Sequence, residues 1–323
     1  MSRERMPGVW ELIRNRMVGT PDDYVLSLAL EGGGMRGVVS GAMLIALRDL
    51  GIAAVFDRMY GTSSGSINLA YFAAGGDWDA LSIYYDHLPY GFVNPVHHLH
   101  RPRLNMTYLF DTVMRSRVPL DVNALKHSEV DVRLGLSNVD TARPELIHAR
   151  QVASDIHQYL MAGAWLPILA GSPYVLNGQR YLDGGLLWPD PLYPALSEGS
   201  THVLMVNTAA DEISTENTWA TRLLLRRALD HWTPGLGSAA LAARGLLAAD
   251  KALLRTNETV DIRGTSVLRI RPAAGSHRVR RLTLDRADLL DGARAGYEAV
   301  FRAFGRPLER TYFAMVDPRR TKD

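Results

Sequence analysis

The chain has 323 residues, of which 47% are hydrophobic and 22% are charged, and this composition is typical of a folded protein and excludes intrinsic disorder. The 36 Lys and Arg residues against 34 Asp and Glu residues leave a net charge of +2, which gives no indication of a nucleic-acid partner. The absence of cysteine excludes disulfides, a thiolate nucleophile and a cysteine-ligated zinc site.

The start of the chain has no pattern of a targeting segment. Residues 1–5 carry charges of both signs, and no apolar core of a signal peptide follows them. Nowhere does an apolar run approach the ~18–20 residues that a bilayer span requires. We therefore expect a soluble, cytoplasmic protein that is at most peripheral at a membrane.

Two strand–turn–helix units come first in the chain. The apolar run 25–30 predicts a buried strand, and apolar residues at helical spacing follow it over 38–50. A short strand is expected over 55–60, with a helix over 67–74. This rhythm predicts an α/β architecture with a central, mostly parallel sheet flanked by helices.

The rest of the chain continues this plan. An Asn-Gly pair inside 174–182 predicts a β-hairpin with a type I′ turn. The span 89–106, with three prolines and several histidines, is typical of a long loop or insertion. Further strands are expected at 130–138, 145–149, 201–208 and 266–271. Further helices are expected at 77–88, 152–164, 190–198, 285–304 and 216–252, the last with a break at Pro234-Gly235. We expect one domain over 1–323, in which 211–323 has no assigned role.

A glycine-rich segment is the first motif that could carry chemistry. Its residues are Gly32, Gly33, Gly34, Arg36 and Gly37. Because it lies between a strand and a helix, its N–H groups and the helix dipole suit a bound anion. The same G-x-G-x-x-G spacing occurs in Rossmann dinucleotide-binding proteins, and Asp57 stands where their ribose-binding acid is expected. Against that alternative, a second turn motif follows within four residues, where a full crossover helix is required.

The second motif is Gly61-Thr62-Ser63-Ser64-Gly65, which has the G-x-S-x-G pattern of a nucleophile elbow. This sharp strand-to-helix turn exposes its central serine, so we expect Ser63 to be a nucleophile. Glycines at 61 and 65 are needed where the flanking chain passes too close to admit a Cβ. Ser64 is expected to cap the following helix.

The third motif is Asp183-Gly184-Gly185, at the end of the predicted hairpin. A carboxylate in this position lies at a sheet edge, where the sites of α/β proteins form. The competing Asp291-Gly292-Ala293 lies among apolar residues at helical spacing, so its aspartate is expected on the solvated side of a helix.

In this order, the three motifs resemble those of the patatin-like phospholipase family. That family has a G-G-G-x-R-G loop, a G-x-S-x-G elbow soon after it, and a D-G-G or D-G-A motif more than a hundred residues later. The resemblance covers about 25–210 and includes an alanine-rich segment with a proline, 161–168. Glu31 stands where many members have aspartate, and the asparagine common after the third motif is absent.

The resemblance implies a three-layer fold and a lipid acyl ester hydrolase of the phospholipase A or lysophospholipase type. Ser63 would attack the ester, and Asp183 would take its proton with no intervening histidine. The N–H groups of Gly33 and Gly34 would hold the oxyanion, with Arg36 bracing their loop. No metal and no cofactor is implied, and the substrate would be a lipid or phospholipid ester.

Three alternatives remain open at this stage. In a Ser-His-Asp hydrolase the histidine follows the acid, and the candidates are His202, His231 and His277. His97, His98 and His100 could bind a metal, although a loop cluster without a carboxylate at helical spacing is more typical of solvated surface. A lipid-binding module without activity would need the same fold but not the complete motif set.

Two segments combine apolar residues with arginines, as suits the interface of an anionic bilayer. The first contains Trp10, Leu12, Ile13 and Met17 with Arg14 and Arg16. The second contains Trp219, Leu223, Leu224, Leu225 and Trp232 with Arg222, Arg226 and Arg227. Packing on the sheet is the simpler reading of the second segment's apolar residues. Our hypothesis is therefore a salt-sensitive peripheral contact led by the arginines of the second segment.

Overall fold

The computed structural model describes residues 6–94, 102–209, 219–251 and 259–306. One mixed sheet has the strand order β5-β6-β3-β2-β1-β7-β9-β8, and β4 pairs with β3 outside this path. The strands are β1 (Leu26–Leu30), β2 (Arg58–Thr62), β3 (Asp131–Asn138), β4 (Arg143–His148), β5 (Tyr174–Leu176), β6 (Gln179–Asp183), β7 (His202–Val206), β8 (Val260–Ile262) and β9 (Thr265–Ile270). Strands β3, β2, β1, β7 and β9 are parallel, so their carboxyl ends meet at one edge.

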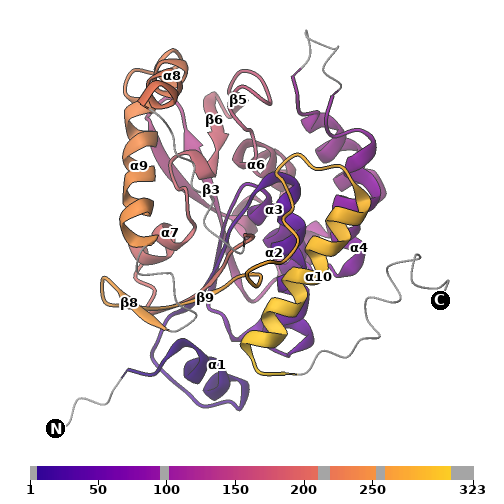
Figure 1. Ribbon diagram of the computed structural model, residues 1–323, viewed down its shortest axis with the longest axis vertical. Helices are drawn as coiled ribbons and strands as arrows, with labels where there is room; N and C mark the ends of the chain where they lie inside the picture. The colour runs from indigo at the N-terminus through magenta and orange to yellow at the C-terminus, as the bar shows by residue number, and fades with distance from the viewer. Residues whose placement is uncertain (1–5, 95–101, 210–218, 252–258, 307–323) are drawn as a thin grey trace.

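Helices on both faces of the sheet give three layers (Figure 1). Helices α2, α3, α4 and α10 lie on one face, and α7 and α9 lie on the other. The helices are α1 (Val9–Met17), α2 (Gly37–Asp49), α3 (Ser64–Ala73), α4 (Trp78–Ser82), α5 (Val122–Lys126), α6 (Ile156–Gly163), α7 (Leu192–Ser197), α8 (Trp219–Asp230), α9 (Leu236–Lys251) and α10 (Arg286–Ala303). The predicted three-layer α/β fold is confirmed.

Alternate residues of the central strands face the two helical layers. In β1, Leu28 and Leu30 belong to the large core cluster that includes the buried side of α2. Ala29 faces the other way and packs with Leu192 of α7. Because strand side chains alternate, a strand covered on both faces is mostly apolar, and the one polar residue of 25–30, Ser27, is buried with its Oγ 2.7 Å from Ser200 Oγ.

The region without an assigned role completes the sheet and reaches the glycine-rich loop. Strand β9 pairs with β7, and α10 packs against α2. The segment between β9 and α10 crosses the start of α2, where the Met35 N–H donates to the Arg281 carbonyl oxygen over 3.0 Å. The C-terminal part therefore contributes to the neighbourhood of the motifs.

Some predicted boundaries are wrong for local reasons. The sequence predicts a strand over 55–60, but β2 begins at Arg58, because residues 53–55 form a 3-10 turn. It predicts one helix over 77–88, but α4 ends at Ser82. A π-helical turn and then a 3-10 turn containing Pro89 follow, and proline has no N–H to continue an α-helix.

The remaining differences concern short or irregular elements, and β8 is not predicted from the sequence. The helix expected over 152–164 starts as a 3-10 segment at Ala149 and becomes regular only at Ile156. Helices α1 and α5 and a π-helical segment, Tyr108–Arg117, are not predicted from the sequence. Residues 95–101 of the expected loop lie outside the described residues.

Candidate active site

The G-x-S-x-G segment lies at the carboxyl end of β2. Gly61 and Thr62 are the last residues of the strand, and Ser64 is the first residue of α3. Between them, Ser63 has φ 55° and ψ −135°, which is rare for a residue with a side chain. Strain of this kind, on the order of 1–3 kcal/mol, is concentrated at functional sites. The turn leaves the Ser63 side chain partly exposed beside a pocket.

The elbow lies directly against the end of β1. A Cβ on Gly65 would lie 2.5 Å from the Leu30 carbonyl oxygen, so the close approach expected at this glycine is present. Gly32 follows β1 at the same place, and it brings the glycine-rich loop beside Ser63.

Asp183 reaches the elbow through strand pairing. It is the last residue of β6, and it pairs with Leu136 of the antiparallel neighbour β3. On the other side of β3, Thr62 pairs with the adjacent residue Gly135. The two motifs therefore end at the same level, on either side of one strand. The Ser63 hydroxyl lies near enough to lower the pKa of the Asp183 carboxyl, in opposition to burial.

The two oxygens of Asp183 have different surroundings. Oδ1 accepts a hydrogen bond from the Gly185 N–H over 2.8 Å, while the buried Oδ2 has no partner with hydrogen-bond geometry in the described part of the chain. Desolvation raises the pKa of Asp183 to about 6, against the lowering effects of Ser63, the Gly185 N–H and the charge of Arg281. Such a carboxylate is a stronger base than an exposed aspartate and is still ionised at neutral pH.

The glycine-rich loop offers two kinds of N–H group. Gly34 begins a 3-10 turn that leads into α2 at Gly37, and it lines the pocket with Ser63. Its N–H makes no hydrogen bond to another described residue. The Gly33 N–H, in contrast, donates to Ser64 Oγ over 2.9 Å. Of the two donors expected from the sequence, Gly34 is available to an anion and Gly33 is already bonded, and Ser64 does not cap α3.

Arg36 braces this loop, as expected. Its side chain is buried, and Nε donates to Thr208 Oγ1 over 2.7 Å while Nη2 lies 3.1 Å from Glu31 Oε1. Glu31 Oε2 in turn accepts the Thr208 N–H over 2.8 Å. Arg36 therefore ties the loop to the segment after β7.

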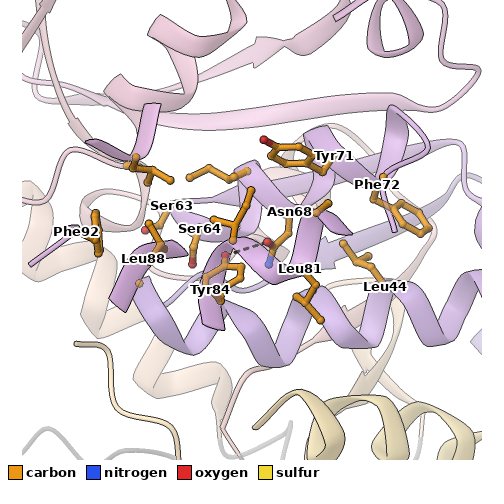
Figure 2. A pocket seen from close by; sticks show the side chains of 18 of the residues that line it. Leu44, Ser63, Ser64, Asn68, Tyr71, Phe72, Leu81, Tyr84, Leu88 and Phe92 are labelled. Carbon is orange, nitrogen blue, oxygen red and sulfur yellow. Dashed lines mark hydrogen bonds between the residues drawn. The ribbon is translucent and has the colours of Figure 1, made fainter. Parts of the chain in front are cut away.

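A largely apolar pocket is lined by Ser63 and by residues of α3 as far as Phe72 (Figure 2). It encloses about 820 Å³, its open mouth included. From Ser63 to Phe72, α3 rises about 13 Å, at 1.5 Å per residue. Apolar side chains that line the pocket include Leu44, Ile45, Ile67, Leu81, Leu88, Phe92, Leu166 and Leu282. Their arrangement suits a hydrocarbon chain whose reacting end lies at Ser63.

The polar residues of the pocket wall other than Ser63 are not placed there by the sequence analysis. Tyr84 donates to Asn68 Oδ1 over 2.9 Å, and Asn68 donates to the Gly37 carbonyl oxygen over 2.8 Å (Figure 2). The helical spacing of Ser64 and Asn68 is the one signal that could have placed two of them together. Nothing local in the sequence indicates Tyr84.

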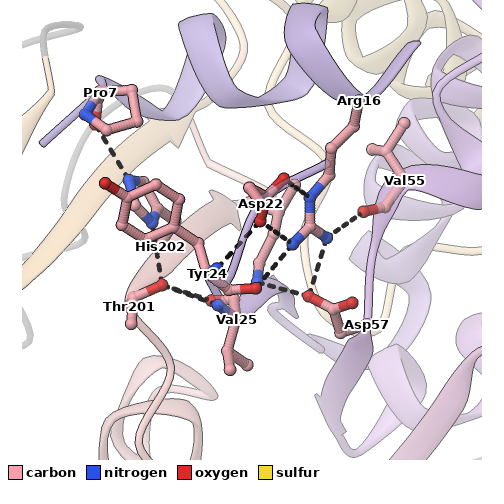
Figure 3. A network of polar contacts seen from close by, with 10 residues as sticks. Pro7, Arg16, Asp22, Tyr24, Val25, Val55, Asp57, Thr201 and His202 are labelled. Carbon is pink, nitrogen blue, oxygen red and sulfur yellow. Dashed lines mark hydrogen bonds and ion pairs between the residues drawn. The ribbon is translucent and has the colours of Figure 1, made fainter. Parts of the chain in front are cut away.

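No histidine of the described residues hydrogen-bonds with Ser63 or Asp183. His202 begins β7 at the opposite edge of the sheet, where Nε2 donates to the Pro7 carbonyl oxygen over 2.9 Å and Nδ1 lies 3.0 Å from Thr201 Oγ1 (Figure 3). His277 pairs with Asp288 over 3.2 Å. These contacts do not support a Ser-His-Asp triad.

The described ranges contain no group of three or more side chains that could hold a metal ion. His97, His98 and His100, the candidates for a metal site, lie outside the described residues.

Asp57 lies at the wrong end of the sheet for a dinucleotide site. It precedes β2, and its Oδ2 accepts from Arg16 Nη1 over 2.8 Å and from the Leu26 N–H over 2.7 Å (Figure 3). Arg16 also pairs with Asp22 over 2.8 Å. The Rossmann alternative is therefore wrong, because Asp57 lies at the amino ends of β1 and β2, while the glycine-rich loop lies at the carboxyl end of β1.

Most apolar residues of the N-terminal segment pack on the protein, while Met17 is 43% exposed. Leu12 and Ile13 are 1% and 0% exposed, and the ring centroids of Trp10 and Phe304 lie 3.9 Å apart. With Arg16 held by Asp22, this helix packs on the core. In the segment of α8, Leu223 and Leu224 are exposed together with the three arginines.

The chain is similar to known proteins in its sequence motifs and in its fold. The model of the family described as patatin-like phospholipase matches residues 28–196. No curated protein matches the chain. Among solved structures, VipD from Legionella pneumophila is similar with 14% identity and a TM-score of 0.46, over 88% of this chain and 67% of that chain. The type III effector protein ExoU is similar with 15% identity and a TM-score of 0.30, over 69% of this chain and 54% of that chain.

Proposed function

The chain belongs to the patatin-like phospholipase family, and we propose that it hydrolyses acyl esters of lipids, in the manner of a phospholipase A or lysophospholipase, through Ser63 and Asp183. One observation carries the proposal. A buried carboxylate with an unpartnered oxygen lies beside a strained serine that lines an apolar pocket. These are the parts that an activated hydroxyl and an acyl chain require.

In the first half of the proposed reaction, Ser63 Oγ attacks the ester carbonyl carbon while Asp183 Oδ2 takes the hydroxyl proton. The new C–O bond forms, and the carbonyl electron pair moves onto oxygen. When the tetrahedral intermediate collapses, the bond to the alcohol breaks, and Asp183 returns the proton to the leaving oxygen. A water molecule then attacks the acyl-enzyme, gives its proton to Asp183, and the fatty acid leaves as that proton returns to Ser63.

Two features of the site lower the barriers of these steps. The pKa of about 6 makes Asp183 a base matched to neutral pH better than an ordinary aspartate. The Gly34 N–H, at the start of a helical segment, is suited to the oxyanion, and the loss of one such donor typically costs about 3 kcal/mol of transition-state stabilisation.

The substrate would be met at a lipid surface through α8. Leu224 is 67% exposed, and Arg222, Arg226 and Arg227 are exposed on the same helix. Leu229 is buried, so α8 packs on the protein by one side and presents leucine and arginine on the other. Within the described residues, no helix is long and apolar enough to cross a membrane. The contact would therefore be peripheral and weakened by salt.

Turnover of a soluble p-nitrophenyl ester and of a phospholipid tests the proposed function. Ser63→Ala and Asp183→Asn should fold yet lose both activities, while EDTA should have no effect. His277→Ala provides the control for a triad and should retain turnover. Near-normal turnover by Asp183→Asn would contradict the dyad.

A further inference from the structure

Ser64 has no part in the proposed chemistry, yet it links the two loops that form the site. It is 6% exposed, and its Oγ accepts the Gly33 N–H over 2.9 Å. Ser64 belongs to α3, which follows the elbow, and Gly33 belongs to the glycine-rich loop. This hydrogen bond therefore sets the position of one loop relative to the other.

A buried polar chain lies behind Ser64. Tyr84, from the π-helical turn Ile83–His87, packs against the Ser64 hydroxyl and donates to Asn68 Oδ1 over 2.9 Å. Asn68 donates to the Gly37 carbonyl oxygen over 2.8 Å, at the first turn of α2. Burial raises the pKa of Tyr84, so its hydroxyl stays protonated and can donate. These hydrogen-bonded side chains join three helical elements behind the glycine-rich loop.

The packing around the two hydroxyls leaves little freedom. A Cβ on Gly37 would lie 2.7 Å from Ser64 Oγ and 2.5 Å from the Tyr84 hydroxyl oxygen. The start of α2 therefore rests directly on both groups. A shift of Ser64 would displace Gly33 on one side and the start of α2 on the other.

We propose that Ser64 is a positioning residue for the oxyanion site, which holds the Gly33 peptide so that the next N–H, that of Gly34, faces the pocket beside Ser63. The proposal rests on the proposed function, since it concerns stabilisation of the oxyanion formed at Ser63. Donors accelerate a reaction when they are held in place before the charge develops. Without the Ser64 hydroxyl, the Gly33 N–H loses its partner, and the loop can rotate to satisfy it elsewhere.

Ser64→Ala tests this role, and Ser66→Ala is its matched control. Ser66 lies on the same helix, and its buried Oγ has no hydrogen-bond partner in the described part of the chain. With a soluble p-nitrophenyl ester, Ser64→Ala should lower kcat roughly ten- to a hundredfold at little change in KM. Ser66→Ala should keep the kcat of the wild type. Tyr84→Phe, which removes only the hydroxyl behind Ser64, should lower kcat by a smaller factor.

Inhibitor binding distinguishes a displaced oxyanion site from general damage to the pocket. A trifluoromethyl ketone forms an oxyanion-like adduct with a nucleophilic serine, whereas the product fatty acid does not. Ser64→Ala should weaken the ketone by about the factor lost in kcat and leave fatty-acid binding unchanged. Ser64→Thr keeps the acceptor oxygen. In a Ser64→Thr protein with the Tm of the wild type, which shows that the added methyl group is accommodated, ketone binding should be restored.

The outcomes distinguish the two proposals. If the wild type is active and depends on Ser63, but Ser64→Ala keeps kcat and ketone affinity within twofold, the positioning role is overturned and the proposed function stands. Equal weakening of the ketone and the fatty acid would likewise overturn it, because the pocket and not the oxyanion site would have changed. If the wild type has no esterase activity, or keeps it in Ser63→Ala, the proposed function itself fails.

Discussion

Gly65 lies against the Leu30 carbonyl oxygen, at the point where a Cβ would come within 2.5 Å of that atom. The contact holds the first turn of α3 on the end of β1. Since the Gly65 Cα and the Leu30 carbonyl oxygen both belong to backbone segments of the core, neither can move away without disturbing the sheet.

Gly65→Ala should therefore lower the free energy of unfolding by about 1–3 kcal/mol, as overpacking of a core does. Gly245→Ala is a matched control, because this glycine of α9 has open space around its Cα and the change should be neutral or stabilising by ~0.5–1 kcal/mol. Urea denaturation measures both. Equal stability of Gly65→Ala and the wild type would show that the elbow relaxes more easily than its packing indicates.

The pH dependence of turnover should report Asp183. Because the base must be ionised, kcat/KM should rise with pH through about 6 and then level off. The profile is measured with a soluble ester, in the wild type and in His277→Ala. A rising limb that disappears with the histidine would assign the titration to another group.

Removal of the Asp183 charge should stabilise the protein at neutral pH. In the folded protein the pKa of Asp183 is about 6, above the ordinary value of 3.8. The carboxyl's contribution to the free energy of unfolding is therefore most favourable below pH 3.8 and is lost as the pH rises through about 6. Asp183→Asn should therefore raise the free energy of unfolding by about 2–3 kcal/mol at neutral pH. The difference should vanish in acid, which is the internal control. A destabilised Asp183→Asn at neutral pH would mean that the carboxylate is better solvated than its burial indicates.

Ala80 lines the pocket, and a Cβ on Gly76, just beyond the end of α3 remote from Ser63, would lie 3.1 Å from the Ala80 Cβ. Ala80→Phe should fill that end and shift the preferred ester toward shorter acyl chains. The ratio of kcat/KM for p-nitrophenyl decanoate to that for the butyrate should fall about tenfold or more, since each excluded methylene is worth about 1 kcal/mol or more. Val175→Phe adds the same ring at an exposed position of β5 and should leave the ratio unchanged. An unchanged ratio in Ala80→Phe would place the acyl chain elsewhere.

Replacement of Arg222, Arg226 and Arg227 by glutamate should weaken sedimentation with anionic liposomes and keep turnover of a soluble ester. Glutamate at the exposed Arg143, Arg302 and Arg306 makes the same change in net charge and should have a smaller effect. Equal binding by the two triple variants would show that α8 is not the contact.

Local sequence pattern was sufficient for most strands and helices, although not for α1, α5 or β8. It also indicated the elbow, because strand-to-helix turns need particular glycines at fixed spacing. The meeting of Asp183 with the elbow was beyond that pattern, since it depends on the pairing of β3 with both β2 and β6. Only the resemblance to a family supplied it at the sequence level.

Other contacts were not predictable for a different reason. The apolar side of α1 has the same periodicity whether it binds a membrane or packs on a core. The burial of Leu12 and Ile13 and the contact of Trp10 with Phe304 are visible only in the folded chain. The bond from Gly33 to Ser64 likewise depends on how two loops approach each other in space. Spacing along the chain carries no information on either.

Covalent labelling with a fluorophosphonate tests most directly whether Ser63 is the nucleophile. The wild type should gain one adduct, and peptide mapping by mass spectrometry should assign it to Ser63. Ser63→Ala should remain unlabelled, while Ser66→Ala should react like the wild type. An adduct on Ser64 or on any other residue, or labelling of Ser63→Ala at the wild-type rate, would contradict the proposed reaction.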